Sequence, residues 1–457
     1  MHRLLVLFSL FSLLPIFSSA HKITLSLSSA VAPPLSSPWQ KLNQLAAASL
    51  ARAHHLKHPK TNISVTKAPL FPKSYGGYSV SLSFGTPTQT LSFVMDTGSS
   101  LVWFPCTQRY KCSSCNFPNI NSVNISRFIP KSSSSVKILG CKNPKCRLVY
   151  PNLGCKQCDK NSTSCTETCP PYIIQYGSGS TGGLLLSETL VFPETSVENF
   201  MVGCSLFSSR QPSGIAGFGR GPESLPVQMG LKKFSYCLVS HRFDDMPVSS
   251  ELVLIRGGAG ATRPTTGNAT IKYTPFHKNP VASRSAFQDY YYVTLRKITV
   301  GGTRVKVPYK FLVPGSDGNG GTIVDSGSTF TVMDNQVHEL VAQEFEKQVG
   351  KHYPRAADVE KESGLRPCFI VSGEKTINLP KLTFKFKGGA KMELPIADYF
   401  SFLDDSVICM TVVTNNGIGQ GILAGPSIIL GNYQQQNFYL EYDLENQRLG
   451  FLKQICH

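Results

Sequence analysis

The feature that most constrains this chain is a short acidic motif that occurs twice. Asp96-Thr97-Gly98-Ser99-Ser100 recurs 229 positions later as Asp325-Ser326-Gly327-Ser328-Thr329. Each copy follows an apolar run that is typical of a buried strand, Phe93-Val94-Met95 in the first and Thr322-Ile323-Val324 in the second. One such motif alone is an ordinary turn that begins with Asp. Two copies with the same flanks predict that both carboxylates are carried inward to one shared site.

The first 20 residues have the pattern of a secretory signal peptide. Arg3 precedes an apolar stretch from Leu4 to Phe17, and Ser18-Ser19-Ala20 offers the small residues of a cleavage site. No later run reaches the roughly 18 apolar residues that span a bilayer, and the last residues carry no lipid-anchor signal. We therefore expect a secreted or vacuolar protein without a membrane anchor.

Cysteine is abundant, with 14 residues in the chain and nine of them between Cys106 and Cys169. In an exported protein this density favours disulfides over metal ligands. Two Cys-x-x-Cys pairs have the form of zinc ligands, but the 39 residues between them exceed the roughly 15 to 20 of zinc ribbons. We expect no metal, and the pairing stays open. The candidate disulfide residues are Cys106, Cys112, Cys115, Cys155, Cys158, Cys204, Cys237, Cys368, Cys409 and Cys456.

Surface modification and charge agree with export. The formal net charge is +17, but residues 1–95 hold eight Lys or Arg and no acid, which leaves +9 from residue 96 onward. Such a remainder is most often a solvated basic surface, with attraction to an anionic matrix as the alternative. Nucleic acid is not an expected partner. Four N-glycosylation motifs lie in polar stretches, at Asn62, Asn124, Asn161 and Asn268.

The chain divides by composition into a leader and two halves. Residues 21–72 are rich in Ser, Pro, Ala and Lys, and we expect a prosegment there with one short helix around residues 40–56. The roughly 385 residues that remain are enough for two cores. We expect an N-terminal lobe over residues 73–260, with a cysteine-rich insert at about 104–170, and a C-terminal lobe over residues 261–457.

The repeating pattern of apolar residues is mainly that of β structure. Tyr78–Phe84 alternates apolar and polar residues before a turn at Gly85-Thr86-Pro87, and residues 290–302 carry a matching pattern in the second half. The clearest helix is predicted over Asn335–Val349, between a capping Asp and a terminating Gly.

The paired acids predict a particular chemistry. Two carboxylates about 3 Å apart repel each other by about 5 kcal/mol at an effective dielectric constant of about 20, so one proton is shared between them. The ionised partner can take a proton from water while the protonated partner donates to a peptide carbonyl under attack, with no metal or cofactor. The supporting residues are Thr97 and Ser326, which can bond across to the opposite turn, Gly98 and Gly327, which admit backbone N–H groups, and Ser99 and Ser328, which can hold the outer carboxylate oxygens.

These motifs resemble those of the pepsin-like aspartic endopeptidases, in particular the plant nepenthesin-type branch with its cysteine-rich insert. The resemblance covers about residues 75–457. Trp103 stands seven residues after Asp96, as does the family's Trp that bonds the flap tyrosine. The segment from Tyr176 and Gly177 to Gly183 resembles the flap hairpin, which makes Tyr176 the residue that covers the substrate. Further similar segments are Ile215–Gly217 and Ile429–Gly431, which match the strands beside each Asp turn, and Gly219–Pro222, Lys233–Cys237 and Asn432–Asn437.

The resemblance implies a fold, a setting and a reaction. The implied fold is mainly β and bilobal, with two β-barrel-like lobes and a central cleft. The implied protein is a plant zymogen in the apoplast, the cell wall or the vacuole, and a monomer that cleaves polypeptides at acidic pH. An anionic cell-wall polysaccharide is a further expected partner for the basic surface. Disulfides between Cys368 and Cys409 and between Cys237 and Cys456 are suggested in the same way.

Two alternatives come from other functional classes. A catalytically silent pepsin-fold binding or inhibitor protein would keep the fold and lose catalytic residues, whereas both Asp turns and Tyr176 are intact here. A glycosidase with two carboxylates also needs paired acids, but these do not normally occupy two copies of one turn. One departure is Ser178, which stands where many nepenthesin-type flaps carry Asp.

Overall fold

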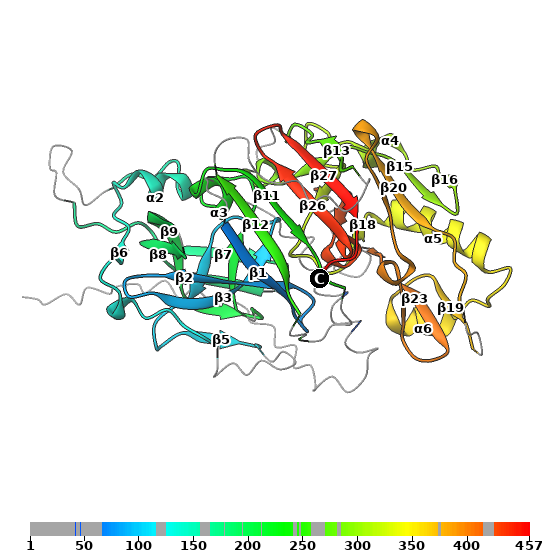
Figure 1. Cartoon of the computed structure of the whole chain (residues 1–457), viewed down its shortest axis with the longest axis horizontal. Helices are drawn as coiled ribbons and strands as arrows, with labels where there is room; N and C mark the ends of the chain where they lie inside the picture. The colour runs from blue at the N-terminus through cyan, green and yellow to red at the C-terminus, as the bar shows by residue number, and fades with distance from the viewer. Residues whose placement is uncertain are drawn as a thin grey trace, which may run out of the picture. The chain divides into compact units, whose positions relative to one another are not determined.

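A computed structural model describes most of the chain after the leader. The described residues are mainly β strand, which confirms the predicted fold class (Figure 1). They belong to one unit that spans residues 33–457. No helix among them is long and apolar enough to cross a membrane. The described residues are Leu42, Ala46, 66–115, 125–155, 165–177, 179–193, 195–211, 213–240, 245, 248–256, 270–280, 285–372, 376–414 and 425–457.

The largest sheet contains 15 of the strands in this described part. One of its hairpins joins β2 (Tyr78–Phe84) to β3 (Gln89–Asp96), as the alternating pattern predicts. The other strands of this sheet are β1 (Thr66–Pro72), β4 (Trp103–Pro105), β5 (Lys111–Ser113), β6 (Lys137–Ile138), β7 (Tyr172–Tyr176), β8 (Gly179–Phe192), β9 (Thr195–Ser209), β10 (Gly214–Gly217), β11 (Leu231–Cys237), β12 (Ser250–Arg256), β13 (Lys272–Pro275), β26 (Phe438–Asp443) and β27 (Arg448–Lys453).

This sheet mixes strands from distant parts of the chain. Its order runs β13, β27, β26, β11, β12, β1, β2 and β3. Strand β26 therefore lies beside β11, with β27 on the other side of β26, and Figure 1 shows both strands in red near the green β11. The predicted boundary between residues 260 and 261 lies outside the described residues.

Strand β1 comes from the end of the predicted prosegment. Thr66–Pro72 pairs antiparallel with β12 on one side and with β2 on the other. Alternate residues of β1 are buried, and Leu70 is fully buried. A leader that ended at residue 72 would therefore include an interior strand of the sheet.

Three smaller sheets contain only strands from the second half. The five-stranded sheet carries the second acidic turn and includes β14 (Tyr292–Val293), β17 (Thr322–Val324), β25 (Ile428–Leu430), β18 (Val332–Met333) and β24 (Val413–Thr414). The four-stranded sheet has β16 (Thr303–Val305), β15 (Leu295–Val300), β20 (Leu382–Phe386) and β21 (Lys391–Glu393), and the three-stranded sheet has β19 (Cys368–Ile370), β23 (Val407–Met410) and β22 (Phe400–Phe402).

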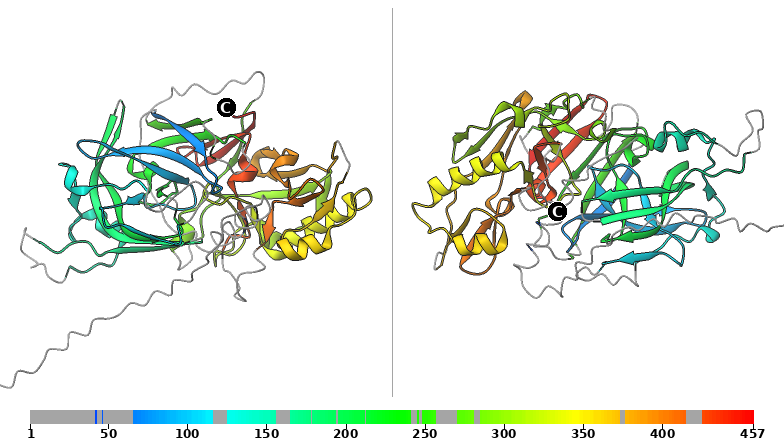
Figure 2. Two further views of the ribbon diagram at one scale, coloured as in Figure 1. Left: turned by 90° about the horizontal axis from the view of Figure 1, so that it is seen from below. Right: turned by 180° about the vertical axis from the view of Figure 1, so that it is seen from behind.

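The longest described helix is α5 (Asn335–Val349), with the predicted bounds. Asp334 caps its first turn by accepting from the Gln336 N–H at 2.9 Å, and Gly350 follows its last residue. Its buried face packs on β15 and β16 (Figure 2, yellow). The shorter helices are α2 (Pro144–Val149), α3 (Leu225–Gln228), α4 (Tyr309–Leu312), α6 (Ala357–Ser363) and the 3-10 turns η2 (Pro130–Ser132), η3 (Ser285–Gln288), η4 (Lys387–Gly389), η5 (Ile396–Asp398) and η6 (Asn432–Gln435).

The helix predicted around residues 40–56 has two described residues, Leu42 and Ala46. Both are helical, and they are 3% and 6% exposed. They belong to a hydrophobic cluster that also contains Phe330 and Tyr433. Phe330 directly follows the second acidic turn in the sequence, and Tyr433 lies in the 3-10 turn after β25. The leader thus contributes apolar side chains to the core of the second half.

Candidate active site

Each acidic turn lies where a buried strand ends. Strand β3 ends at Asp96, and β17 ends one residue before Asp325. The strands are anchored by fully buried apolar side chains, among them Met95 and Ile323. Asp96 and Asp325 themselves have no exposed surface. Both carboxylates are therefore held in a low-dielectric setting, where their polar contacts are strong.

The two carboxylates are oriented by the same set of donors. In each turn the glycine N–H donates to Oδ1 of the Asp, at 2.8 Å for Gly98 and 2.9 Å for Gly327. The serine three residues after each Asp, Ser99 or Ser328, donates its hydroxyl to Oδ2. Such bonds to a carboxylate are stronger than bonds between neutral groups. The two oxygens of each acid are thereby distinguished in the same way.

Reciprocal hydrogen bonds join the two turns across 229 positions of sequence. The Thr97 N–H donates to Ser326 Oγ at 3.0 Å, and the Ser326 N–H donates to Thr97 Oγ1 at 2.9 Å. The Thr97 hydroxyl donates on to the Val324 carbonyl at 3.1 Å, and the Ser326 hydroxyl to the Met95 carbonyl at 2.9 Å. The structure therefore brings together the two turns that the sequence predicts to meet.

A second strand passes beside each acidic turn. Strand β10 pairs in parallel with β3, with Gly217 opposite Asp96. Strand β25 pairs in parallel with β17, with Leu430 opposite Val324. Backbone bonds continue this pairing into the turns, because the Phe218 N–H donates to the Asp96 carbonyl at 2.6 Å. These are the two segments that the resemblance places beside the acids.

Glycine ends each of these flanking segments because no side chain fits there. A Cβ added to Gly217 would lie 2.1 Å from the carbonyl oxygen of Ser100. A Cβ added to Gly431 would lie 2.5 Å from the carbonyl carbon of Phe330. In both cases the obstacle is backbone of the acidic turn, which cannot rotate away as a side chain would. The close approach of strand and turn thus depends on glycine.

Tyr176, the predicted flap residue, is hydrogen-bonded to Trp103, as the resemblance predicts. Strands β7 and β8 form a hairpin with Tyr176 opposite Gly179, and Gly177 lies at its turn. The Trp103 Nε1–H donates to the Tyr176 hydroxyl oxygen at 2.8 Å, and both side chains are buried. Trp103 in turn pairs with Ile215 of β10. One chain of contacts therefore connects the hairpin with the strand beside Asp96. Ser178 lies outside the described residues.

A group of buried polar side chains contacts the Asp325 turn, and the sequence did not predict this role for it. Gln435 donates through Nε2 to the carbonyls of Leu430, at 2.9 Å, and of Asp325, at 3.3 Å. Its Oε1 accepts from the Tyr236 hydroxyl at 2.7 Å. Gln435 and Tyr236 both stand in segments that resemble the nepenthesin branch. The sequence offers no direct signal for this role, because Gln435 stands in the polar run Asn432–Asn437.

The disulfides include both pairs that the resemblance suggests, Cys237 with Cys456 and Cys368 with Cys409. The first ties β11 to the C-terminal end of the chain, and the second joins β19 to β23. Cys165 is also in a disulfide, and Cys158 lies outside the described residues. The other described bonds are Cys106–Cys204, Cys112–Cys115, Cys141–Cys155 and Cys146–Cys169.

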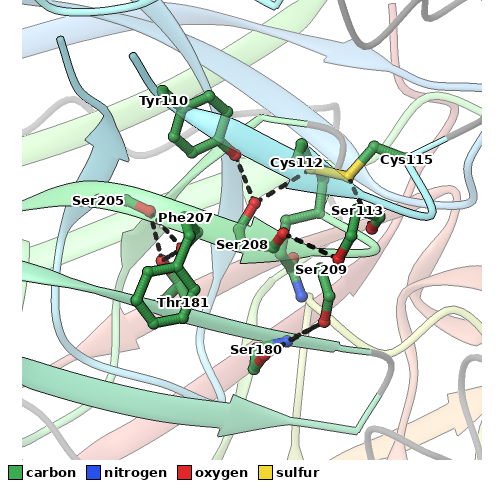
Figure 3. Close-up of a disulfide and its surroundings, with 11 residues drawn as sticks. Tyr110, Cys112, Ser113, Cys115, Ser180, Thr181, Ser205, Phe207, Ser208 and Ser209 are labelled. Carbon is green, nitrogen blue, oxygen red and sulfur yellow. Dashed lines mark hydrogen bonds between the residues drawn. A yellow bond between two sulfur atoms is a disulfide. The ribbon is translucent and has the colours of Figure 1, made fainter. Parts of the chain in front are cut away.

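The Cys-x-x-Cys pairs that could resemble zinc ligands are bonded instead. Cys112 pairs with Cys115 next to β9, where the Cys112 sulfur and the Tyr110 hydroxyl both contact Ser208 Oγ (Figure 3). Cys155 pairs with Cys141. Within the described ranges, no group of three His, Cys, Asp or Glu side chains is placed to hold a metal ion.

Other predicted features fall outside the described residues. They are the signal peptide over residues 1–20 and the glycosylation sites Asn62, Asn124, Asn161 and Asn268.

Two family models match the chain over most of its length. The model described as xylanase inhibitor N-terminal matches residues 78–252, and the model described as xylanase inhibitor C-terminal matches residues 290–453. Among curated proteins, a probable aspartyl protease of Arabidopsis thaliana is 33% identical over 83% of this chain and 82% of its own length. The aspartic proteinase nepenthesin-1 of Nepenthes gracilis is 31% identical over 83% of this chain and 78% of its own length.

Solved structures with the same fold are more distant in sequence. The crystal structure of edgp superposes with a TM-score of 0.64 at 19% identity and covers 87% of this chain and 97% of that one. Basic 7S globulin from soybean gives a TM-score of 0.59 at 19% identity, over 85% of this chain and 96% of its own. At this level of identity the likeness supports the fold alone.

Proposed function

Because this chain belongs to the plant pepsin-like aspartic protease family, we propose that it is an aspartic endopeptidase with Asp96 and Asp325 as its catalytic pair. The observation that carries the proposal is the mirrored geometry of the two acidic turns. Each carboxylate is buried and receives one backbone N–H and one serine hydroxyl. The reciprocal bonds of Thr97 and Ser326 hold the turns to each other.

The proposed reaction uses one proton shared by the two acids. The ionised carboxylate takes a proton from a water held between the pair, and this water attacks the peptide carbonyl carbon. The protonated carboxyl donates a hydrogen bond to the carbonyl oxygen and then its proton. Collapse of the tetrahedral intermediate breaks the C–N bond, and the leaving nitrogen takes up the proton that came from the water. Acid conditions favour this state, because the reaction needs one of the two acids to keep its proton.

The flap and the leader complete the proposal. We propose that Tyr176, whose hydroxyl accepts from Trp103, covers a polypeptide substrate bound along the turns. Residues 1–20 direct export to the apoplast, the cell wall or the vacuole, and the prosegment is then removed. Because β1 is an interior strand, we propose that cleavage occurs before Thr66 and not at residue 72.

A digest with an inhibitor arm tests the proposed activity. Purified, acid-incubated protein is mixed with a denatured protein substrate between about pH 3 and pH 6, with and without a saturating statine-type inhibitor, whose hydroxyl mimics the attacking water. We expect peptide release that the inhibitor abolishes. Cleavage that continues undiminished with inhibitor would exclude the two-acid mechanism. No cleavage at any pH in this range would favour a silent pepsin-fold binding protein.

The folded state should itself be more stable in acid because of Asp398, a buried carboxyl in η5. Asp398 is 1% exposed, and its Oδ2 has no hydrogen-bond partner among the described residues. Burial raises the pKa of Asp398 to about 8. An unfolded Asp ionises near pH 4, so stability is lost as the pH rises from about 4 to about 8 while the folded group stays protonated.

Asp398→Asn should remove this loss. We expect the free energy of unfolding of the variant, relative to wild type, to improve by about 5 kcal/mol between pH 4 and pH 8. Urea unfolding at both pH values measures it. Asp405→Asn, on the exposed part of the neighbouring turn, is the control. Parallel pH curves for wild type and Asp398→Asn would rule out Asp398 as the cause.

A further inference from the structure

A directed chain of hydrogen bonds runs from strand β26 to the turn that carries Asp325. The side-chain amide of Gln435 donates to two backbone carbonyls, that of Leu430 and that of Asp325. Leu430 lies opposite Val324, the residue before Asp325. The Gln435 carbonyl oxygen can only accept, so Tyr236 must be the donor in the 2.7 Å bond between them. Tyr236 has one hydroxyl proton, and that proton is now assigned.

The second tyrosine extends the chain to β26. The hydroxyl oxygens of Tyr236 and Tyr442 are 3.0 Å apart. Because the Tyr236 proton goes to Gln435, Tyr442 is the donor in this pair. The direction is therefore Tyr442 to Tyr236 to Gln435 to the backbone of the Asp325 turn. All three side chains are fully buried, so water does not compete for these bonds.

The far end of the chain lies next to the other acidic turn. Burial raises the pKa of Tyr442. Hydrogen bonding with the hydroxyls of Tyr236 and Thr97 lowers this pKa, and the negative charge of Asp325 raises it. Thr97 is the residue that bonds across to Ser326. Tyr442 therefore stands close to both halves of the site, although it belongs to neither acidic turn.

Aromatic packing keeps this chain in place. The Tyr442 ring stacks on Phe234 at 4.3 Å between ring centroids, and it meets the Tyr291 ring edge-on at 4.7 Å. The Tyr291 hydroxyl donates to the Phe218 carbonyl at 2.9 Å, with the Gly219 carbonyl as a more distant second acceptor at 3.2 Å, and both residues follow β10 beside Asp96. These ring contacts hold the Tyr442 side chain in place, and with it the position of the hydroxyl oxygen.

We propose that Tyr442, Tyr236 and Gln435 form a positioning bridge that sets the place of the Asp325 turn relative to the Asp96 turn. The inference rests on the proposed function, in which these acids are the catalytic pair. The hydrogen bonds of the bridge reach the Asp325 turn through the backbone carbonyls of Asp325 and Leu430, so we assign the three residues a positioning role and not a catalytic one. The bridge matters because the distance between the acids sets how strongly they share one proton. A displacement of about 1 Å costs as much as 100-fold in rate.

Tyr236→Phe is the first test, because it removes only the central hydroxyl. We expect kcat to fall by about 10-fold to 100-fold, with KM changed less than about twofold. We also expect the two limbs of the pH profile of kcat/KM to move toward each other, because acids that stand farther apart repel each other less. If the variant only contained less folded protein, the apparent kcat would fall by the same factor at every pH, and the limbs of the pH profile would not move. Unchanged kcat, or an unchanged pH profile, would overturn the bridge.

Two further variants separate position from packing. Tyr399→Phe is the matched control, since its buried hydroxyl donates to the Pro380 carbonyl at 3.0 Å, away from both turns, and should leave kcat unchanged. Gln435→Glu should retain activity at low pH, where a protonated acid can still accept from Tyr236 and donate to Leu430. It should lose activity faster than wild type as the pH rises, since an ionised side chain cannot donate. Equal pH dependence in Gln435→Glu and wild type would contradict the assigned direction.

Hydrogen exchange provides a readout that needs no activity. In Tyr236→Phe we expect the amides of residues 325–328 to exchange at least about 10-fold faster than in wild type, and in Tyr399→Phe we expect no change there. If wild type digests nothing but the exchange behaves as expected, the proposed function fails and the bridge stands. If wild type digests protein but the exchange and pH profile of Tyr236→Phe match wild type, the bridge fails alone.

Discussion

Replacing Asp96 by asparagine is expected to lower kcat on a denatured protein by about 1,000-fold or more while the fold is kept. The amide is almost the same size as the carboxyl, and its oxygen can still accept from the Gly98 N–H that lies 2.8 Å from Oδ1. It can neither take a proton from water nor carry the shared proton. Steady-state kinetics of the purified variant, with thermal unfolding as a check on the fold, measure the effect.

A matched control is Asp334→Asn, which makes the same chemical change at a site with a structural role. Asp334 caps α5, and Asn is an equally good cap, so activity and stability should stay at wild-type levels. Wild-type turnover by Asp96→Asn would refute the catalytic assignment. A similar loss in both variants would mean that the assay reports folding and not chemistry.

Gly217→Ala should disrupt the site through the backbone alone. The added Cβ would stand 2.1 Å from the Ser100 carbonyl oxygen, so β10 or the Asp96 turn must move. We expect the free energy of unfolding to fall by about 3 kcal/mol or more, which is typical of severe overpacking. Because the displaced turn holds Asp96, kcat should also fall by about 100-fold. Urea unfolding and steady-state kinetics on the same preparation measure both effects.

Gly140→Ala is the control for this clash. Its added Cβ would meet only the Glu167 carbonyl oxygen, at 3.8 Å, which is ordinary contact. Its stability should lie within about 0.5 kcal/mol of wild type. If Gly217→Ala were as stable and as active as Gly140→Ala, the close approach of β10 to the Asp96 turn would be wrong.

The parts of the structure that follow local rules could be predicted. The helix at Asn335–Val349 has a capping residue, an apolar stripe and a terminating glycine within one short segment, and its bounds are confirmed. The hairpin of β2 and β3 follows from alternation and a turn. For the site, the motif indicates which atoms can bond across, and the structure places Thr97 and Ser326 in that arrangement.

The parts that depend on distant partners could not be predicted. Alternation shows which face of a strand is buried, but it does not show which strand lies beside it. Nothing in the sequence therefore indicated that β26 pairs with β11, or that β1 continues the sheet beyond the predicted prosegment boundary. The bond from Tyr236 to Gln435 spans 199 positions and was missed for the same reason.

The cysteine-rich insert shows the same limit. Cys141–Cys155 and Cys146–Cys169 close loops that overlap in sequence. Spacing alone does not rank this pattern above nested or sequential pairings. Here the three-dimensional path of the chain decides the connectivity.

Strands β26 and β27 can join the large sheet only after nearly the whole chain has been synthesised. The pairing of β26 with β11 and the Cys237–Cys456 bond both bridge more than 200 residues, 219 in the case of the disulfide. Such long-range contacts form late. Tyr442 lies on β26. A ribosome-bound chain that still lacks residues 438–453 therefore cannot yet form the proposed bridge. A nascent chain would therefore gain the proposed catalytic arrangement only when its synthesis is nearly complete.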